Sequence, residues 1–507
     1  MSTIDESIEK LADYALEHHL ISEYEKDYSI NRLLDVLNLD SFHAPEEEAK
    51  DVELEPTLKE LLDFAAEHGI LPENTTLYRD LLDTKIMDCF TMRPDMVIQT
   101  FYALFQSEGS KSATDWYYQF SKDTDYIRTY RVKKDLSWKS DTPYGPIDIT
   151  VNLSKPEKDP KAIAAARLKK SDVYPKCALC KENVGYRGRL DAPARETLRI
   201  IPVQLSGDPF YLQYSPYSYF PEHCIVFNAK HVPMVVNDAT FRHLLEFVSL
   251  FPHYMLGSNA DLPIVGGSIL THDHYQGGGY SFPMFHAKEA FPLSFEGFDG
   301  VKASYLYWPL SVIRLVSKSK DELRILADKI LASWRMYSDP SLGILAVSEG
   351  KPHNTITPIV HFDAETHSFV LDLTLRNNRT SEEYPLGIFH PHAEFWNIKK
   401  ENIGLIEVMG RAILPSRLVA EMNAVKEGIL HGEDLRKNPQ TEKHAAWAEG
   451  LLKRHPEANG ENLDGILRAE IGRSFQGVLE CAGVFKNDEE GKQGVYRFVD
   501  FVNAENA

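Results

Sequence analysis

The residues best suited to chemistry in this 507-residue sequence lie in the glycine-rich stretch 266–279. His272, His274 and Gln276 occupy alternate positions there, so a strand would present all three on one face. Imidazole is a competent nucleophile toward phosphorus, and a phospho-histidine bond is labile enough to be discharged again. The flanking glycines would let a phosphate or ribose approach the backbone closely. The alternative is a polar surface strand with incidental histidines, but so many glycines would weaken a strand that binds no ligand.

A second group of residues has the spacing of a metal site. Cys177 and Cys180 form a CxxC pair, which supplies half of a tetrahedral zinc site. No second CxxC follows, so histidine would have to complete the set, and His231 and His272 are the candidates. The alternatives are a redox pair or two buried thiols.

Two further features concern anion binding and repetition. Arg376 and Arg379 suit bidentate contact with phosphate or carboxylate, although the same segment could be an exposed polar turn. The pair of histidines at 272 and 274 recurs as His390-Pro-His392. This recurrence is either chance or the mark of two copies of one unit, and the spacing alone does not decide.

The elements that must position these residues follow from hydrophobic periodicity. Residues 1–140 are mainly helical, and residues 141–310 and 311–425 both mix strands with helices. Residues 426–507 are again mainly helical, ending in a strand-like segment, Val495–Val502. The sequence therefore predicts an α+β protein with helical regions at both ends.

Charge and cysteine content exclude several classes of protein. The formal net charge of −20 repels polyanions, so we expect no nucleic-acid partner. We expect no signal peptide, since residues 1–9 carry acidic side chains and no apolar core, and no apolar run is long enough to span a membrane. Five cysteines in 507 residues are too few for a disulfide framework. We expect a soluble cytoplasmic protein.

A combined likeness to known proteins is carried by five stretches: Val151–Glu157, Cys177–Val184, Phe227–His231, His272–Gln276 and Gly387–Met409. Together they resemble the galactose-1-phosphate uridylyltransferases, specifically their second bacterial class, a branch of the histidine triad superfamily. The resemblance covers roughly residues 140–420, and the terminal helical regions are also similar to that class. It implies two related histidine-triad-like halves, each an antiparallel sheet with helices, with helical N- and C-terminal additions.

The resemblance also implies roles for individual residues. His274 would be the nucleophile and Gln276 the phosphate ligand, and Ser268 looks like the phosphate-binding serine of the family. Zn²⁺ would be held by Cys177, Cys180, His231 and His272. Substrate binding would further involve Arg376, Arg379, His390 and His392, and a second metal is left unassigned. Asp273 and Tyr275 stand where the better-known first class has proline and glycine, which leaves the local backbone geometry open.

The activity implied is transfer of UMP from UDP-glucose to galactose 1-phosphate by a ping-pong route through a uridylyl-histidine. The partners would be UDP-glucose, UDP-galactose and hexose 1-phosphates, and the family is commonly dimeric. One alternative is a nucleotide phosphorylase or hydrolase of the same superfamily, which Gln276 disfavours because hydrolases usually carry a third histidine there. The other is a non-catalytic nucleotide-binding protein, which the His274–Gln276 pair disfavours.

Overall fold

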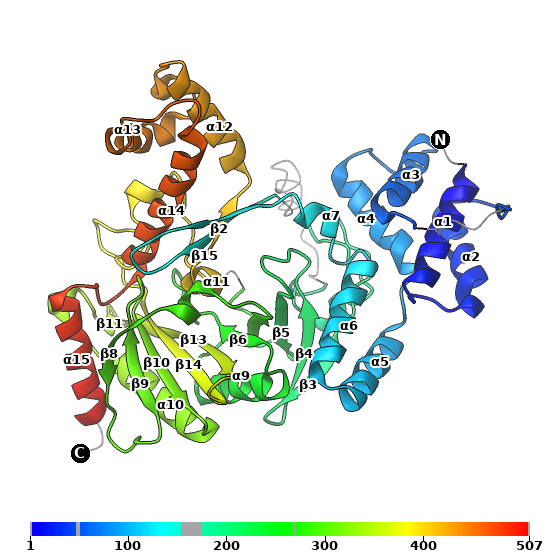
Figure 1. Cartoon of the computed structure of the whole chain (residues 1–507). Helices are drawn as coiled ribbons and strands as arrows, with labels where there is room; N and C mark the ends of the chain where they lie inside the picture. Colours follow the sequence, from blue (N-terminus) through cyan, green and yellow to red (C-terminus); the bar gives the residue numbers. More distant parts are fainter. Residues whose placement is uncertain (1–2, 47–50, 154–173, 268, 505–507) are drawn as a thin grey trace.

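The computed structural model describes residues 3–46, 51–153, 174–267 and 269–504. Its centre is one antiparallel sheet with the strand order β3-β4-β5-β7-β6-β13-β14-β10-β9-β8 (Figure 1). The first set of five strands is β3 (Ile201–Leu205), β4 (Asp208–Tyr214), β5 (Cys224–Asn228), β6 (Met255–Ser258) and β7 (His274–Gly278). The second set is β8 (Glu289–Leu293), β9 (Lys302–Leu306), β10 (Val312–Ser317), β13 (Asn354–Asp363) and β14 (Ser368–Asn377).

The two sets share one topology. In each set the fifth strand lies between the third and the fourth, and the two fourth strands, β6 and β13, pair at the middle of the sheet. A helix joins the third strand to the fourth in both sets, α9 (Asp238–Leu250) in the first and α10 (Lys320–Met336) in the second. The prediction of an α+β fold with two related halves is confirmed.

The two halves meet where β6 pairs with β13, through Leu256 with Val360 and Gly257 with Ile359. Gln276 of β7 pairs with Gly257 on one side of this seam, and Asp372 of β14 pairs with Ile359 on the other. Strand β14 thus takes the place in the second half that β7 takes in the first. Its residues, Ser368–Asn377, include no histidine, so β14 holds no counterpart of His274.

The recurring histidine pair does not follow this symmetry. His274 opens the fifth strand of the first half, whereas His390 and His392 lie beyond the end of β14, the fifth strand of the second half. The interpretation of these histidines as equivalent residues in two copies is therefore wrong. The strand order also groups β8 and β9 with the second half, while the predicted domain boundaries at residues 140, 310 and 425 stay predictions.

Helices α9 and α10 cover one face of the sheet because each presents an apolar stripe to it. In α9, the residues at three- and four-residue spacing are buried in the same hydrophobic core as Tyr275 of β7 and Leu373 of β14. Asn237 caps the start of α9 by accepting a hydrogen bond from the amide of Thr240. His274 and Gln276, which flank Tyr275 in the strand, therefore face away from these helices.

A second, smaller sheet lies beyond the opposite face of the large one. Strand β2 is paired with β1 on one side and, in parallel, with β15 on the other (Figure 1). The short helix α11 (Leu405–Val408) precedes β15 and packs with it in a second hydrophobic core. The strands of the remaining sheets are β1 (Leu136–Ser140), β2 (Ile147–Asn152), β15 (Arg411–Pro415), and the two-stranded pair β11 (Val347–Ser348) and β12 (Lys351–Pro352).

Helices form both ends of the chain, as the sequence predicts, and stand apart on two sides of the sheet in Figure 1. No helix of the described residues is both long and apolar enough to cross a membrane. The N-terminal helices are α1 (Ile4–Glu17), α2 (Lys26–Val36), α3 (Leu54–Glu67), α4 (Thr76–Asp88), α5 (Pro94–Ser107), α6 (Ser110–Asp123) and α7 (Thr129–Val132). The C-terminal helices are α12 (Arg417–Leu430), α13 (Ala445–Arg454), α14 (Leu463–Ala482) and α15 (Glu489–Ala504).

The strand predicted over Val495–Val502 is wrong, because this segment lies inside helix α15. Its buried residues are Val495, Phe498, Val499 and Val502, which have helical spacing and pack in the core that also buries α10. The run of β-branched and aromatic residues suggested a strand, but the spacing of the apolar positions decides the structure.

Removing the carboxylate of Asp372 should destabilise the second half of the sheet. Both oxygens of this fully buried carboxylate accept hydrogen bonds from Arg314, at 2.7 and 2.8 Å. Asp372→Asn would leave the buried guanidinium without its counter-charge, and the expected loss is about 3–5 kcal/mol. The midpoint of urea unfolding, followed by circular dichroism, measures it. The matched control is Glu289→Gln, which breaks an exposed ion pair with Lys302 and should cost less than about 1 kcal/mol; equal losses would contradict the prediction.

Candidate functional site

His274 is held as a nucleophile would be. Its side chain is 5% exposed, and its Nδ1 donates a hydrogen bond of 2.8 Å to the backbone carbonyl of His272. This bond places the proton on Nδ1 and leaves the lone pair on Nε2. Burial lowers the pKa of His274 to about 4, so the ring is neutral at pH 7 and Nε2 can attack an electrophile.

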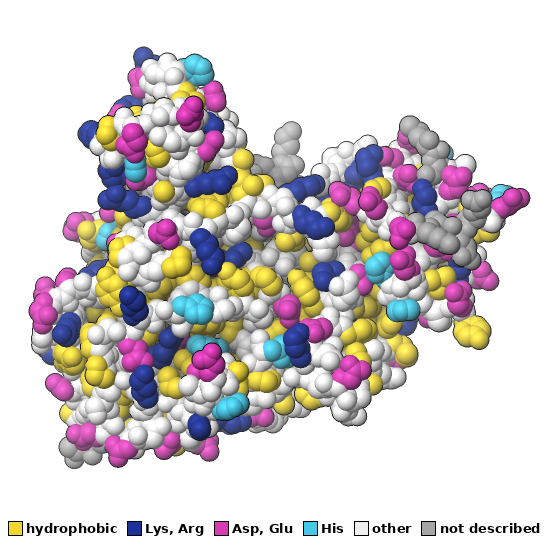
Figure 2. Space-filling model, in the orientation of Figure 1, with side chains coloured by type: hydrophobic (Ala, Val, Ile, Leu, Met, Phe, Trp, Pro, Cys, Tyr) yellow, Lys and Arg dark blue, Asp and Glu magenta, His cyan; other side chains and the backbone are white. Residues whose placement is uncertain are grey.

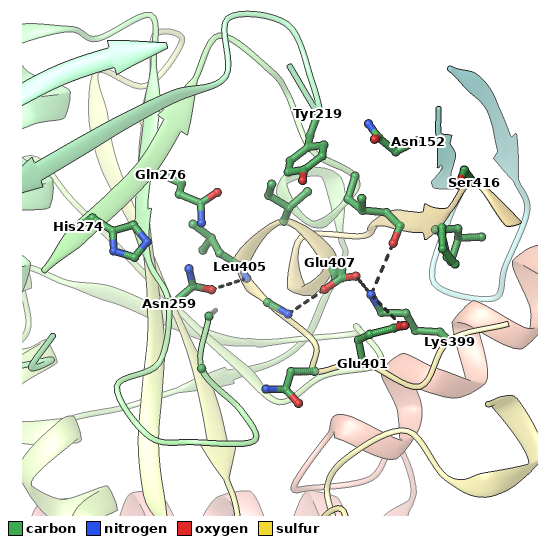
Figure 3. Close-up of a pocket in the computed structure, with 18 residues that line it drawn as sticks. Asn152, Tyr219, Asn259, His274, Gln276, Lys399, Glu401, Leu405, Glu407 and Ser416 are labelled. Atoms are coloured by element: carbon green, nitrogen blue, oxygen red, sulfur yellow. Dashed lines mark hydrogen bonds and ion pairs between the residues drawn. The ribbon is translucent and has the colours of Figure 1, made fainter. Parts of the chain in front are cut away.

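A cavity of about 810 Å³ lies in front of His274 and Gln276 (Figure 3). Three parts of the chain form its walls: the first half of the large sheet, strand β2 with β15, and the segment that follows the second half. The lining residues are Asn152, Tyr219, Asn259, Gly266, Gly267, His274, Gln276, Lys399, Glu401, Asn402, Gly404, Leu405, Ile406, Glu407, Ile413, Leu414, Pro415 and Ser416. The volume suits a small ligand rather than a polymer.

The wall opposite His274 is a rigid polar segment. Lys399 and Glu407 form an ion pair although both are buried, and the Glu407 carboxylate also accepts the amide of Gly404 at 2.8 Å. Asn259, from the first half, accepts the amide of Leu405 at 2.9 Å. Figure 3 shows these contacts across the cavity floor. Residue types and spacing give no sign of these roles, because the segment comes to the site through tertiary contacts such as that of Leu405 with Asn259, 146 residues away in the sequence.

The glycines of the 266–279 stretch serve backbone packing as much as ligand access. A Cβ atom on Gly277 would lie 2.2 Å from the carbonyl oxygen of Met255, and one on Gly266 would lie 2.5 Å from that of Ala260. Only Gly266 and Gly267 among them line the cavity. The glycine density therefore indicates close contact between backbone segments, with room for a ligand at one end.

Cys177, Cys180, His231 and His272 lie together, as the CxxC pair and the resemblance predict. Their donor atoms all lie within 4.8 Å of one another. Cys177 Sγ is 3.2 Å from Nδ1 of His272, Cys180 Sγ is 3.1 Å from Nδ1 of His231, and the two sulfurs are 3.5 Å apart. Two thiols and two imidazoles at these separations fit the four ligands of one tetrahedral metal ion.

The surroundings of the cluster also fit a metal. Nε2 of His272 donates to the carbonyl of Asn228 at 2.8 Å, which fixes the tautomer and leaves Nδ1 free as a ligand. The Asn183 amide donates to the carbonyls of Cys177 and Cys180, at 2.8 Å each, and so holds the CxxC turn. The cluster can therefore hold a metal ion.

His272 and His274 do not share a strand face, which corrects the prediction for this block. Strand β7 begins at His274, and His272 lies in the bend before it, turned toward the cysteines. His274 and Gln276 alone share the face that lines the cavity. The bend separates the two histidines because Asp273, between them, pairs through its backbone with the loop that carries His231.

The two departures from the family pattern have clear structural roles. The Asp273 amide donates to the carbonyl of Val232 at 2.7 Å, a bond that proline could not make, and its carbonyl accepts the amide of Asn228 at 2.9 Å. Tyr275 points to the opposite face, where its hydroxyl bonds Nδ1 of His243 at 2.9 Å. Both residues fix the strand without entering the cavity.

The other predicted substrate-binding residues do not line the cavity in the described part of the chain. Arg376 is buried under the 403–407 segment and donates to the carbonyl of Ile403 at 3.0 Å. Arg379 donates to the carbonyl of Gly343 at 3.1 Å. His390 contacts Asn402, a lining residue, at 3.3 Å, and so reaches the site only indirectly. His392 donates to the carbonyl of Ile388 at 3.0 Å.

Ser268 lies outside the described residues, so its expected role in phosphate binding stays a prediction. The face of the molecule in Figure 2 is hollowed between the two helical ends, and Lys and Arg side chains lie around this hollow. A small anionic substrate can therefore meet local positive charge on a protein whose net charge is −20.

Comparison with known proteins identifies the family of the chain. The family model for the N-terminal domain of galactose-1-phosphate uridyl transferase matches residues 19–233, and the model for the C-terminal domain matches residues 247–449. A galactose-1-phosphate uridylyltransferase of Halalkalibacterium halodurans is 50% identical over 508 aligned residues, covering 99% of both chains. Those of Clostridium acetobutylicum and Bacillus subtilis are 48% and 46% identical, each covering 98% or more of both chains. No solved structure matches the chain.

The fold and the site thus define a two-halved α+β protein with one buried histidine facing a cavity beside a cluster of metal-ligand residues. The chain belongs to the galactose-1-phosphate uridyl transferase family, which confirms the resemblance found in the sequence. Its relatives are transferases by name, and the alignments run over essentially the whole chain.

Removing one cysteine of the cluster should abolish metal binding. Cys180→Ala deletes a thiolate ligand that two histidines approach, so bound metal should fall from one ion per chain to nearly none. Elemental analysis of purified protein measures the content. Cys89→Ala, which changes a half-buried cysteine outside the cluster, is the control and should keep the metal. Equal metal content in both variants would show that the cluster is not the site.

Proposed function

We propose that this protein transfers UMP from UDP-glucose to galactose 1-phosphate through a uridylyl group carried on His274. The observation that supports this most strongly is the neutral, buried His274, whose Nε2 lone pair faces a cavity of about 810 Å³. Relatives named galactose-1-phosphate uridylyltransferase, 46–50% identical over nearly the whole chain, support the choice of substrates.

The proposed reaction has two displacements at one phosphorus atom. His274 Nε2 attacks the α-phosphorus of UDP-glucose, the bond to the bridging oxygen breaks, and glucose 1-phosphate leaves with the electron pair. The attack puts positive charge on the imidazole, which the Nδ1–H bond to the His272 carbonyl stabilises. A phosphate oxygen of galactose 1-phosphate then attacks the uridylyl group, His274 leaves, and UDP-galactose forms.

Gln276 is the residue we expect to bind the phosphoryl oxygens. It lies on the same strand face as His274, two positions along, and lines the same cavity. Negative charge builds on the non-bridging oxygens in each transition state, so a fixed amide donor beside them lowers the barrier. Ser268, two residues beyond the lining residue Gly266, is proposed as a further donor.

Zinc is the ion we propose for the Cys177, Cys180, His231 and His272 cluster, because two sulfur and two nitrogen ligands suit Zn²⁺. When bound, the ion would supply structural rigidity. Its ligand His272 provides the carbonyl that orients His274, so the cluster would fix the nucleophile without touching the substrate. The identity of a second metal is not assigned.

We propose a cytoplasmic setting from the state of the cysteines. All five cysteines are free, which agrees with a reducing cytoplasm. A homodimer is the expected assembly from family likeness, with hexose phosphates and UDP-sugars as the partners.

Incubation with UDP-glucose and galactose 1-phosphate separates the proposal from its rivals: exchange supports a transferase, hydrolysis a hydrolase, and no reaction a binding protein.

Replacing His274 with asparagine should abolish the covalent intermediate. The parent protein should exchange labelled glucose 1-phosphate into UDP-glucose without galactose 1-phosphate, because the covalent uridylyl-enzyme intermediate forms reversibly. In His274→Asn this exchange should fall roughly a thousandfold or more, because the nucleophile itself is gone. Mass spectrometry of quenched parent enzyme should place the uridylyl mass on His274.

Two further variants make this test specific. His272→Asn should weaken metal binding and leave some exchange, because the nucleophile remains. His361→Asn makes the same change on β13 of the second half, outside the lining of this cavity, and should keep near-parental exchange. A uridylyl mass on another residue, or near-parental exchange by His274→Asn, would refute the mechanism.

A further inference from the structure

His223 is a buried histidine next to the proposed phosphate ligand, and the mechanism above gives it no role. It lies just before β5 and is 2% exposed. Its Nε2 is 3.1 Å from Oε1 of Gln276, and its Nδ1 has no hydrogen-bond partner among the described residues. The rings of Tyr219 and Phe220 lie 5.5 and 4.5 Å from the His223 ring, which fixes the ring in place.

The position of the single ring proton follows from these contacts. Burial lowers the pKa of His223 to about 4, so the ring is neutral at pH 7 and carries one N–H. A proton on Nδ1 would be a buried donor without an acceptor, which is rare and costly in proteins. A proton on Nε2 instead donates to Oε1 of Gln276 and leaves only a lone pair unpaired on Nδ1.

The tautomer of His223 decides which end of the Gln276 amide faces the ligand. The two orientations of a glutamine amide fill nearly the same space, so the hydrogen-bond partners select one. With Oε1 bound to His223, the NH₂ group is the end left for the cavity, since no other partner of this side chain occurs in the described part of the chain. In the opposite orientation, a carbonyl oxygen would face the phosphoryl oxygens and repel them.

We propose that His223 is a positioning residue that locks the Gln276 amide with its NH₂ group toward the transferred phosphoryl group. Its catalytic consequence rests on the proposed function, whereas the tautomer and the amide orientation do not. His223 would act only through Gln276 and would not touch the substrate. The transition state, in which charge on the phosphoryl oxygens is greatest, should gain most from this arrangement.

The first test reads the tautomer directly. Protein labelled with ¹⁵N in its histidine rings, measured at pH 7 by long-range proton–nitrogen correlation NMR, should show His223 protonated on Nε2. The resonances are assigned by their loss in the His223→Gln variant. A ring protonated on Nδ1, or a ring carrying both protons, would overturn the proposal whether or not the protein transfers uridylyl groups.

The second test compares a variant that keeps the donor with one that lacks it. His223→Phe keeps an aromatic ring but cannot donate a hydrogen bond. It should lower kcat of uridylyl exchange by about 10- to 100-fold, with little change in KM, because the Gln276 NH₂ group would lose its charge-assisted hydrogen bond to the phosphoryl oxygens. His223→Gln places an NH₂ group near the position of Nε2 and should recover kcat to within a few-fold of the parent. Thermal midpoints of both variants control for a loss of packing.

The third comparison separates positioning from a structural role. In a Gln276→Ala background the amide is absent, so adding His223→Phe should cause no further loss of exchange. Losses that multiply in the double variant, or a His223→Gln variant as impaired as His223→Phe, would show that His223 serves the fold alone. If the parent protein catalyses no uridylyl exchange, the proposed function fails, and the NMR measurement then decides this inference by itself.

Discussion

The hydrogen bond from His274 Nδ1 to the carbonyl of His272 is the contact on which the candidate site depends. It joins two histidines that face different environments, one in the cysteine cluster and one at the cavity. Because the acceptor is a backbone atom of a predicted metal ligand, the geometry of the cluster passes to the proposed nucleophile through a few covalent bonds. Asp273 adds two backbone hydrogen bonds to the 228–232 loop, so the segment has little freedom to rotate.

The internal symmetry of the sheet shows why the candidate site lies in one half. Strand β7 presents His274 and Gln276 to the cavity, whereas its counterpart β14 has no histidine. In β14, Asp372 is fully buried and both its oxygens accept hydrogen bonds from Arg314, so this side chain serves the fold. The second half instead contributes through the segment after it, residues 399–407, which forms the far wall of the cavity.

The proposed role of His223 and the structure of the cluster share one principle. A neutral imidazole carries a proton on one of its two nitrogens, and the hydrogen-bond acceptor next to the ring decides which one. This choice fixes whether the site meets a lone pair of the ring or a donor group of the hydrogen-bonded partner. His272 and His274 each donate a hydrogen bond to a backbone carbonyl. Their other ring nitrogens then direct a lone pair at the metal cluster and at the cavity, respectively. In the proposed arrangement, His223 donates to the oxygen of the Gln276 amide, so the NH₂ group of that amide faces the cavity.

Much of the fold and part of the site could be predicted from the sequence. Hydrophobic spacing predicts the helical ends, whereas the residue types of Val495–Val502 favour a strand and only the spacing of its apolar positions indicates the helix. The grouping of Cys177, Cys180, His231 and His272 came from the CxxC pair and from family likeness. The chemistry of Arg376 and Arg379 predicts anion binding, but in the structure both guanidinium groups donate to backbone carbonyls away from the cavity.

The sequence by itself determined which side chains can do chemistry, because nucleophiles, metal ligands and strand alternation are properties of residue type and local spacing. It also determined that His274 and Gln276 share a face, since alternate residues of one strand must. Only the tertiary structure decided that His272 turns away from them, that Asn259 holds Leu405 at the cavity, and that His223 reaches Gln276. The physical reason is that hydrogen bonds and ion pairs between distant segments depend on strand register and burial, which no local pattern encodes.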